Sequence, residues 1–300
     1  MYAMIRTSLP WTSAITTLLV VVGKAGITRA DFLWGAIRWD AFYNSSTMPS
    51  DVGVWTARVL TPVVWEDRLP WFAYRQPGGN VTFDGNSPDV MAKEIEFAVN
   101  SGIDHWAFDV YPPEIAMSNS LAAYLSSSSP SKNRLSFCLL LQTSWMTQGG
   151  LAAWPAKVAL YVQHFARPEY RLVLAGRPLI YLFAVDQGAW GNVSTGWQDW
   201  AAALLLLRNA SVAAGRGAPY VVLQTWNPAD GAAQLHAINT AAGSDVVVAL
   251  SAYAGLGATD AGTPWDTFAA GVGKWLVWAS ACTRVCICLC ARACISVCIL

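Results

Sequence analysis

Apolar, strand-like runs alternate with helical patterns along most of the chain. The Ser-Pro-Asp sequence at 87–89 combines a capping hydroxyl, a first-turn proline and an acidic residue, which are helix start signals. Met91, Ile95 and Ala98 then recur on one helical face, and residues 103–111 follow as an apolar run ended by two prolines. The pattern predicts a helix that leads directly into a buried strand.

The same alternation repeats on both sides of this unit. Further helices are expected at 116–126, 151–165, 197–214 and 232–242, and further strands at 32–40, 135–141, 177–183, 220–226 and 245–253. Strands that are apolar throughout and alternate with helices favour a parallel sheet covered on its faces. With about six units and no phosphate-binding glycine loop, the predicted fold class is α/β, of the (β/α)8 TIM-barrel type, truncated after about six strand–helix units.

The composition is sufficient for a large hydrophobic core, and it limits the classes of partner that the protein is expected to bind. Hydrophobic residues make up 54% of the 300 residues and charged residues only 13%, with 19 basic and 19 acidic side chains. This balance lacks the basic excess of a nucleic-acid-binding protein, so no nucleic acid is expected as a partner. Three scattered histidines form no metal constellation, and we predict neither a metal nor a cofactor. The 16 tryptophans are either core aromatics or stacking surfaces for sugar rings.

The first thirty residues have the features of a secretory signal peptide. Arg6 provides a positive n-region, and 11–23 is an apolar stretch that is shorter than a membrane span. The alternative is an uncleaved hydrophobic anchor. Four glycosylation sequons, at Asn44, Asn80, Asn192 and Asn209, agree with passage through the secretory pathway. We therefore expect a secreted or secretory-lumen glycoprotein with no membrane span beyond the signal segment.

The C-terminal segment has a composition unlike the rest of the chain. Cys138 is the only cysteine in the first 281 residues, whereas six cysteines lie within 282–298. Their spacing contains no Cys-x-x-Cys zinc pattern, and Arg284 and Arg292 interrupt the apolar runs. We interpret 31–278 as an incomplete barrel domain and 279–300 as an aberrant tail, translated from an intron or a shifted frame. A palmitoylated or membrane-associated tail is the alternative. Because the last units of the barrel are missing, two strand edges are expected to be exposed.

Candidate site residues follow from the barrel geometry, because active sites of this fold lie at the carboxyl ends of the strands. Aromatic, carboxylate and amide side chains gather at the predicted strand ends. They are Trp39, Asp40, Asp109, Tyr111, Gln142, Ser144, Trp145, Asp186, Gln224, Trp226, Asn227, Ser251 and Tyr253. Such a mixture suits a carbohydrate cleft, so the expected partner is an oligosaccharide or polysaccharide.

Glycoside hydrolysis normally needs two carboxyl groups, one protonated and one ionised. Asp109 is the first candidate, because it ends a buried strand among aromatic residues, and Asp40 is the second. Each has a structural alternative, namely hydrogen bonding to neighbouring loop amides. Predicted substrate-binding residues are Trp39, Tyr111, Trp145, Asp186, Trp226, Asn227 and Tyr253, and the tryptophans among them serve equally well as wall or core.

Several segments are similar to a known family. Residues 35–43, 94–98 with 102–111, 134–141, 175–181 and 245–253 resemble, in order, the glycoside hydrolase family 99-like domain, over about 33–275. The resemblance implies a (β/α)8 barrel acting on glycosidic bonds; endo-α-mannosidase relatives cleave internal α-mannosidic linkages. Alternatives are a non-catalytic glycan-binding or inert fragment, and a glycosyltransferase-associated protein of polysaccharide biosynthesis.

The resemblance stops before the part of the family that carries its chemistry. Catalytic glutamates of family members lie in a Trp-Asn-Glu-Trp-like segment near the C-terminus. In this chain Trp226 and Asn227 precede Pro228 and belong to an earlier strand, and the pattern is lost after Trp275. No catalytic residue of the family is therefore carried over. We expect this chain not to hydrolyse α-mannan oligosaccharides.

Overall fold

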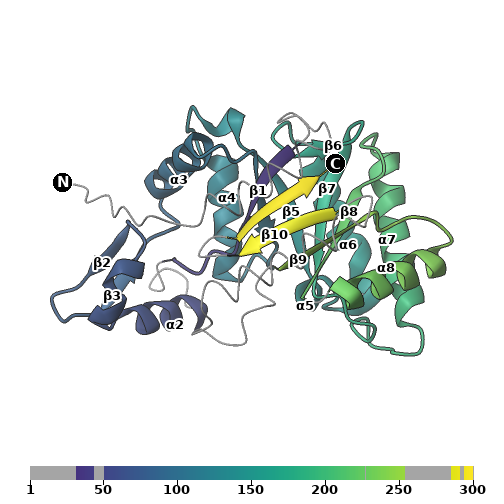
Figure 1. The fold of residues 1–300 in the computed structure, drawn as a ribbon, viewed down its shortest axis with the longest axis horizontal. Helices are drawn as coiled ribbons and strands as arrows, with labels where there is room; N and C mark the ends of the chain where they lie inside the picture. Colours follow the sequence, from purple (N-terminus) through teal and green to yellow (C-terminus); the bar gives the residue numbers. More distant parts are fainter. Residues whose placement is uncertain (1–31, 44–50, 227, 254–284, 291–293, 300) are drawn as a thin grey trace, which may run out of the picture.

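A computed structural model describes residues 32–43, 51–226, 228–253, 285–290 and 294–299 (Figure 1). The predicted signal segment and the sequon at Asn44 lie outside these ranges, so cleavage and secretion stay predictions. None of the described helices is both long and apolar enough to cross a membrane.

The six predicted strands run parallel to one another in the main sheet, and they confirm the predicted α/β class with six units. They are β1 (Phe32–Arg38), β4 (His105–Asp109), β5 (Ser136–Gln142), β7 (Arg177–Phe183), β8 (Tyr220–Thr225) and β9 (Ala249–Tyr253). Each pairs in parallel with its neighbour, in the order β1, β4, β5, β7, β8, β9. The two-residue strand β6 (Leu172–Val173) pairs antiparallel with β7.

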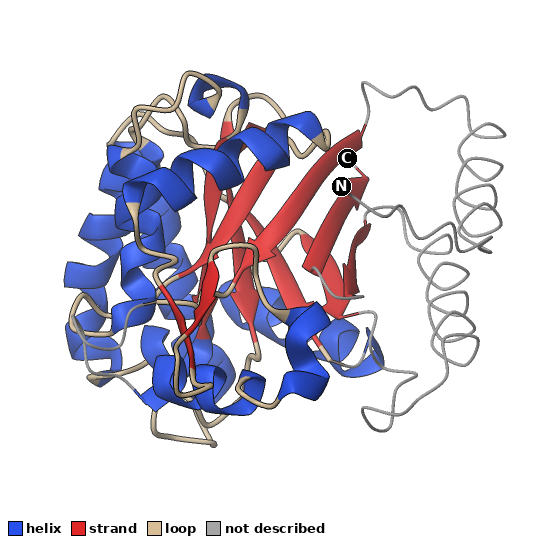
Figure 2. Ribbon diagram, turned by 90° about the vertical axis from the view of Figure 1, so that its left-hand side faces the viewer, coloured by secondary structure: helices blue, strands red, loops and turns tan. Residues whose placement is uncertain are grey.

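Helices connect successive strands and cover the outer side of the sheet, as Figure 2 shows. They are α3 (Pro88–Asn100), α4 (Asn119–Ser126), α5 (Thr143–Met146), α6 (Gly150–Phe165), α7 (Gly196–Ala213) and α8 (Pro228–Ala242). The predicted start of α3 is confirmed, since the Ser87 hydroxyl accepts a hydrogen bond from the Val90 N–H at 3.3 Å and Pro88 opens the helix. Short 3-10 turns at Ala116–Ser118 and Lys132–Arg134 flank α4.

An insertion between β1 and α3 projects from one side of the barrel (Figure 1). It contains α2 (Asp51–Leu60), a 3-10 helix at Val63–Arg68, and the antiparallel strands β2 (Ala73–Arg75) and β3 (Val81–Phe83).

Two strands from the cysteine-rich tail occupy the edges that we expected to be open. β10 (Val285–Cys290) pairs in parallel with β9, and β11 (Cys294–Ile299) pairs antiparallel with both β10 and β1. Because β5 also pairs with β7, the strands form a closed ring of eight. The expectation of unpaired edges is thus wrong for this structure, since edge N–H and C=O groups pair with any available strand-forming segment. The origin of the tail stays a prediction.

Candidate functional site

The period of two along each strand separates inner from outer side chains. Trp106 and Phe108 of β4 contact Tyr124 of α4, at ring-centroid distances of 6.0 and 5.4 Å, so they face the helical layer. His105 and Asp109 alternate with them and therefore face the barrel interior. Asp109 is the last residue of β4, which places its carboxyl group at the carboxyl end of the barrel.

Asp109 is a buried carboxyl group with one satisfied and one unsatisfied oxygen. Its Oδ2 accepts a hydrogen bond from the Tyr111 hydroxyl at 2.7 Å, whereas Oδ1 has no partner, and the residue is 8% exposed. Burial raises the pKa of Asp109 to about 7, against smaller lowering effects of Tyr111 and the Val110 N–H. Near neutral pH this group is present in both protonation states, so it can donate or accept a proton.

Aromatic side chains flank Asp109 and continue along the same end of the barrel. The Tyr111 ring lies 5.9 Å from that of Trp145, which α5 presents directly after β5. Beyond β8, Trp226 is 54% exposed and its ring lies 5.2 Å from that of Phe183. Trp39, just after β1, is 57% exposed. These residues place aromatic rings at the same end of the barrel as the Asp109 carboxyl group.

Asp40 takes part in an ion-pair network instead. Its carboxylate pairs with the Arg38 guanidinium, which also contacts Glu94 of α3 at 2.9 Å. Arg38 lies 4.3 Å over the outward-facing Trp106 ring, so the network sits between β1 and the helical layer. Burial of Glu94 raises its pKa, with Arg38 opposing. The structure therefore does not bring Asp40 and Asp109 together, and it gives Asp40 a structural partner.

The other predicted site residues are placed as follows. Asp186 is exposed in the loop after β7, and its Oδ1 accepts a hydrogen bond from the Gly188 N–H at 2.7 Å. Tyr253 ends β9, and only its backbone is described. Asn227 lies outside the described residues.

Interior polar groups to which the sequence analysis assigned no role lie on β4, β8 and β9, although Gln224 and Ser251 were among the polar residues at the predicted strand ends. The side chains of Gln224 and Ser251 are completely buried, and neither amide atom of Gln224 nor the Ser251 hydroxyl has a hydrogen-bond partner. His105 is also fully buried without a partner on either ring nitrogen, and burial lowers its pKa to about 3. The available signal was a polar residue at an inward position of an otherwise apolar strand.

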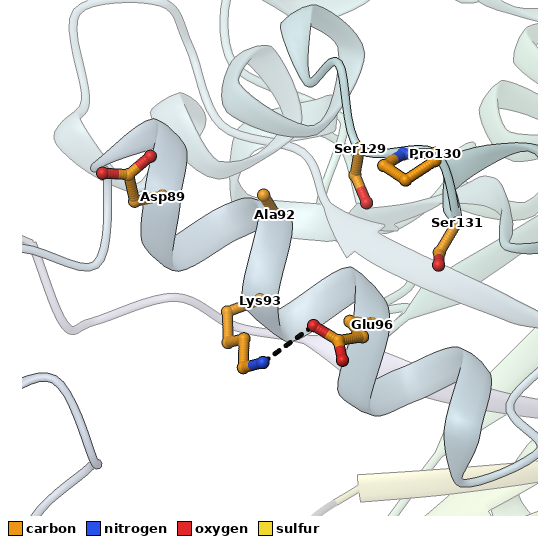
Figure 3. Close-up of a pocket in the computed structure, with 7 residues that line it drawn as sticks. All are labelled: Asp89, Ala92, Lys93, Glu96, Ser129, Pro130 and Ser131. Carbon is orange, nitrogen blue, oxygen red and sulfur yellow. Dashed lines mark hydrogen bonds and ion pairs between the residues drawn. The ribbon is translucent and has the colours of Figure 1, made fainter.

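A pocket on the helical layer is a separate feature, shown in Figure 3. It lies between α3 and the loop before β5 and is lined by Asp89, Ala92, Lys93, Glu96, Ser129, Pro130 and Ser131. Lys93 and Glu96 form an ion pair of 2.8 Å there, both well exposed, so ordinary surface solvation accounts for them. Among the described residues, no group of three His, Cys, Asp or Glu side chains is arranged to hold a metal ion.

No protein-family model matches the chain, and no curated protein matches it. Among solved structures, the chain is similar to the GH99 endo-α-mannosidase from Bacteroides thetaiotaomicron in complex with Bis-Tris-propane, with 14% identity and a TM-score of 0.48. That match covers 86% of this chain and 68% of the other. Another structure of the GH99 enzyme from the same organism gives 13% identity, coverages of 82% and 67%, and a TM-score of 0.44. At these values the likeness transfers no activity and no residue role to this chain.

Proposed function

We propose that this protein binds glycans at the carboxyl end of its barrel, as a glycoside hydrolase-like protein that does not itself hydrolyse them. The observation that carries the proposal is the buried Asp109 carboxyl group, whose Oδ1 has no protein partner. In its protonated form this oxygen donates a hydrogen bond to a glycan oxygen, while Oδ2 stays bonded to Tyr111.

The surroundings of Asp109 favour a carbohydrate over a charged ligand. Tyr111 and Trp145 place aromatic rings beside the carboxyl group, and Trp226 and Trp39 are exposed at the ends of β8 and β1. A protonated carboxyl group is neutral, so a neutral oxygen-rich ligand suits it better than an anion. Oligosaccharides, with α-mannosidic linkages as the sequence resemblance implies, are the proposed ligand class.

Binding without hydrolysis follows from the number of free carboxyl groups. A glycosidase places two of them on opposite sides of the scissile bond. Of the carboxylates at the described strand ends, Asp40 pairs with Arg38 and Asp186 bonds to its own loop, which leaves Asp109. The described part of the chain therefore presents one half of such a pair.

Calorimetric titration with α-mannan oligosaccharides between pH 5.5 and 8.5 tests the proposal. Wild-type affinity should be highest below pH 7 and should fall as pH rises through the Asp109 pKa of about 7. Asp109→Ala should weaken binding at least about tenfold, as expected for a lost hydrogen bond to a buried polar group. Asp109→Asn, which keeps a donor, should bind without this pH dependence.

Asp89→Asn is the matched control, because Asp89 lies in the pocket on the helical layer. It should bind like the wild type at every pH. Chromatography of the incubated oligosaccharides should show no cleavage. Cleavage by the purified chain would contradict the absence of hydrolysis, and equal binding by Asp109→Ala would contradict the site.

A further inference from the structure

Gln224 and Ser251 lie on the same face of the barrel wall as Asp109. The register pairs Asp109–Leu140, Leu140–Tyr181, Tyr181–Val222 and Val222–Ala249 follow one face through β4, β5, β7, β8 and β9. Gln224 and Ser251 lie two residues further along β8 and β9, so they share this inward face. They are also direct register partners, which makes their side chains neighbours.

Both side chains are polar, fully buried and without partners. Burial of an unpaired donor or acceptor costs about 1–3 kcal/mol per group, and three such groups come together here: the two amide atoms of Gln224 and the Ser251 hydroxyl. Backbone pairing holds the positions, because the Gln224 carbonyl accepts a hydrogen bond from the Ala184 N–H. An unsatisfied native polar group needs an explanation, and a ligand is one.

The chemistry of the pair selects a neutral hydroxyl group. Gln224 offers donors and an acceptor, Ser251 offers one of each, and neither carries charge. The cation on this face of the neighbouring strand, Arg177, lies at the opposite end of β7 and donates to the carbonyls of Ala218 and Pro219. Among the described residues, an anionic ligand would find no counter-charge beside the pair, whereas a hydroxyl group both donates and accepts at one atom.

We infer that Gln224 and Ser251 form an interior binding position that takes one hydroxyl group of a glycan. This inference rests on the proposed glycan-binding function and deepens it, because it names where the glycan is held apart from Asp109. The competing explanation is a buried polar defect that binds nothing.

Two variants distinguish these explanations, each measured by urea unfolding and by titration with α-mannan oligosaccharides. Gln224→Leu replaces the unpaired amide by an apolar side chain of similar size, so the free energy of unfolding should stay equal or rise. Ser251→Ala removes only the hydroxyl. Both should weaken binding at least about tenfold, because the glycan hydroxyl loses its partner.

Ser211→Ala is the matched control, since this buried serine of α7 already donates to the Gly217 carbonyl at 2.7 Å. It should lower stability and leave affinity unchanged. Wild-type affinity in Gln224→Leu and Ser251→Ala, with stability equal or raised, would show a buried defect and overturn the inference while the Asp109 site stands. Absence of wild-type binding would overturn the proposed function and this inference with it.

Discussion

The two faces of the same strands differ in how completely their side chains are satisfied. On the outer face, Trp106 and Phe137 pack edge-on against Tyr124 and Phe108 packs against it at a tilt, at ring-centroid distances of 5.4–6.0 Å. The Tyr124 hydroxyl is satisfied as well, because it donates to the Leu135 carbonyl. On the inner face, His105, Asp109, Gln224 and Ser251 are buried with polar atoms that have no partner.

This difference assigns the two faces different roles: the outer face contributes to stability, and the inner face is the candidate for binding. Interlocked rings bury large areas and add favourable edge-on contacts, so the outer face supports the fold. Unpaired polar atoms on the inner face oppose folding, and such violations of packing rules are expected at functional sites. A variant of the outer face should therefore cost stability, whereas a variant of the inner face should alter binding or pH dependence.

The largest effect is expected from Phe137→Ala on the outer face. Phe137 is completely buried and contacts four other rings, so truncation should lower the free energy of unfolding by about 3–5 kcal/mol. Urea unfolding measures the change. Leu160→Ala on α6, at a residue 54% exposed, should stay within about 0.5 kcal/mol. Equal losses in the two variants would contradict the outer cluster as a source of stability.

Asp109→Asn should uncover opposing pH effects on the inner face. The Asp109 pKa rises from 3.8 to about 7 on folding, so its stabilising contribution is complete below about pH 4 and is lost as pH rises through 7. The His105 pKa falls from 6.5 to about 3, so its contribution is complete above about pH 6.5 and is lost on acidification. In the wild type, between pH 4 and 6.5, the stabilising contribution of Asp109 falls as pH rises while that of His105 increases.

Without the Asp109 titration, the His105 contribution to the pH dependence of the free energy of unfolding remains. The stability of Asp109→Asn relative to wild type should therefore decrease on acidification from pH 6.5 to 4, by up to about 1.4 kcal/mol per pH unit. Urea unfolding at each pH gives this difference directly. Parallel pH profiles of the two proteins would show that Asp109 does not titrate in this range.

Gly35→Ala tests the close packing around His105. A methyl group at Gly35 would lie 2.3 Å from Cε1 and Nε2 of the His105 ring, so either the ring or β1 must move. The expected loss is about 1–3 kcal/mol, as for overpacking of a core. His105→Ala should relieve the clash, so the double variant should lose less than the sum of the two single variants. Strict additivity would contradict the contact.

The smallest effect concerns the helical layer, where Ser87 caps α3. Ser87→Ala should cost about 1 kcal/mol, because the Val90 N–H loses its acceptor. Ser126→Ala, at an exposed position near the end of α4, is the control and should stay within about 0.5 kcal/mol. A larger loss at Ser126 than at Ser87 would contradict the cap.

Local patterns in the sequence predicted the main elements well. The helix expected at 151–165 is observed at Gly150–Phe165, and the strand expected at 177–183 at Arg177–Phe183. Boundaries shifted where local signals were weak: the helix expected from 116 begins as a 3-10 turn, and the strand expected from 245 begins at Ala249. Hydrophobic periodicity identifies elements more reliably than their ends.

Site chemistry was less accessible from the sequence. Asp40 lies just after an apolar strand and Asp109 ends one, so the sequence did not distinguish them. In the structure Arg38 pairs with Asp40 and with Glu94, which is 56 residues away along the chain, whereas burial raises the pKa of Asp109. The sequence placed Gln224 and Ser251 at predicted strand ends but gave no reason to assign them a function. Partner and burial depend on which strands become neighbours, and short sequence windows do not contain that information.

By itself, the sequence determined the alternation of six strands and their helices, the capped start of α3, and a strand end rich in aromatic and carboxyl groups, because each depends on neighbouring residues. Tertiary structure decided the rest. It set which face each strand turns inward, raised the pKa of Asp109 through burial, left Gln224 and Ser251 unpaired, and joined β10 and β11 to the open edges. These properties arise from contacts between distant segments, whose energies exist only once the barrel wall has formed.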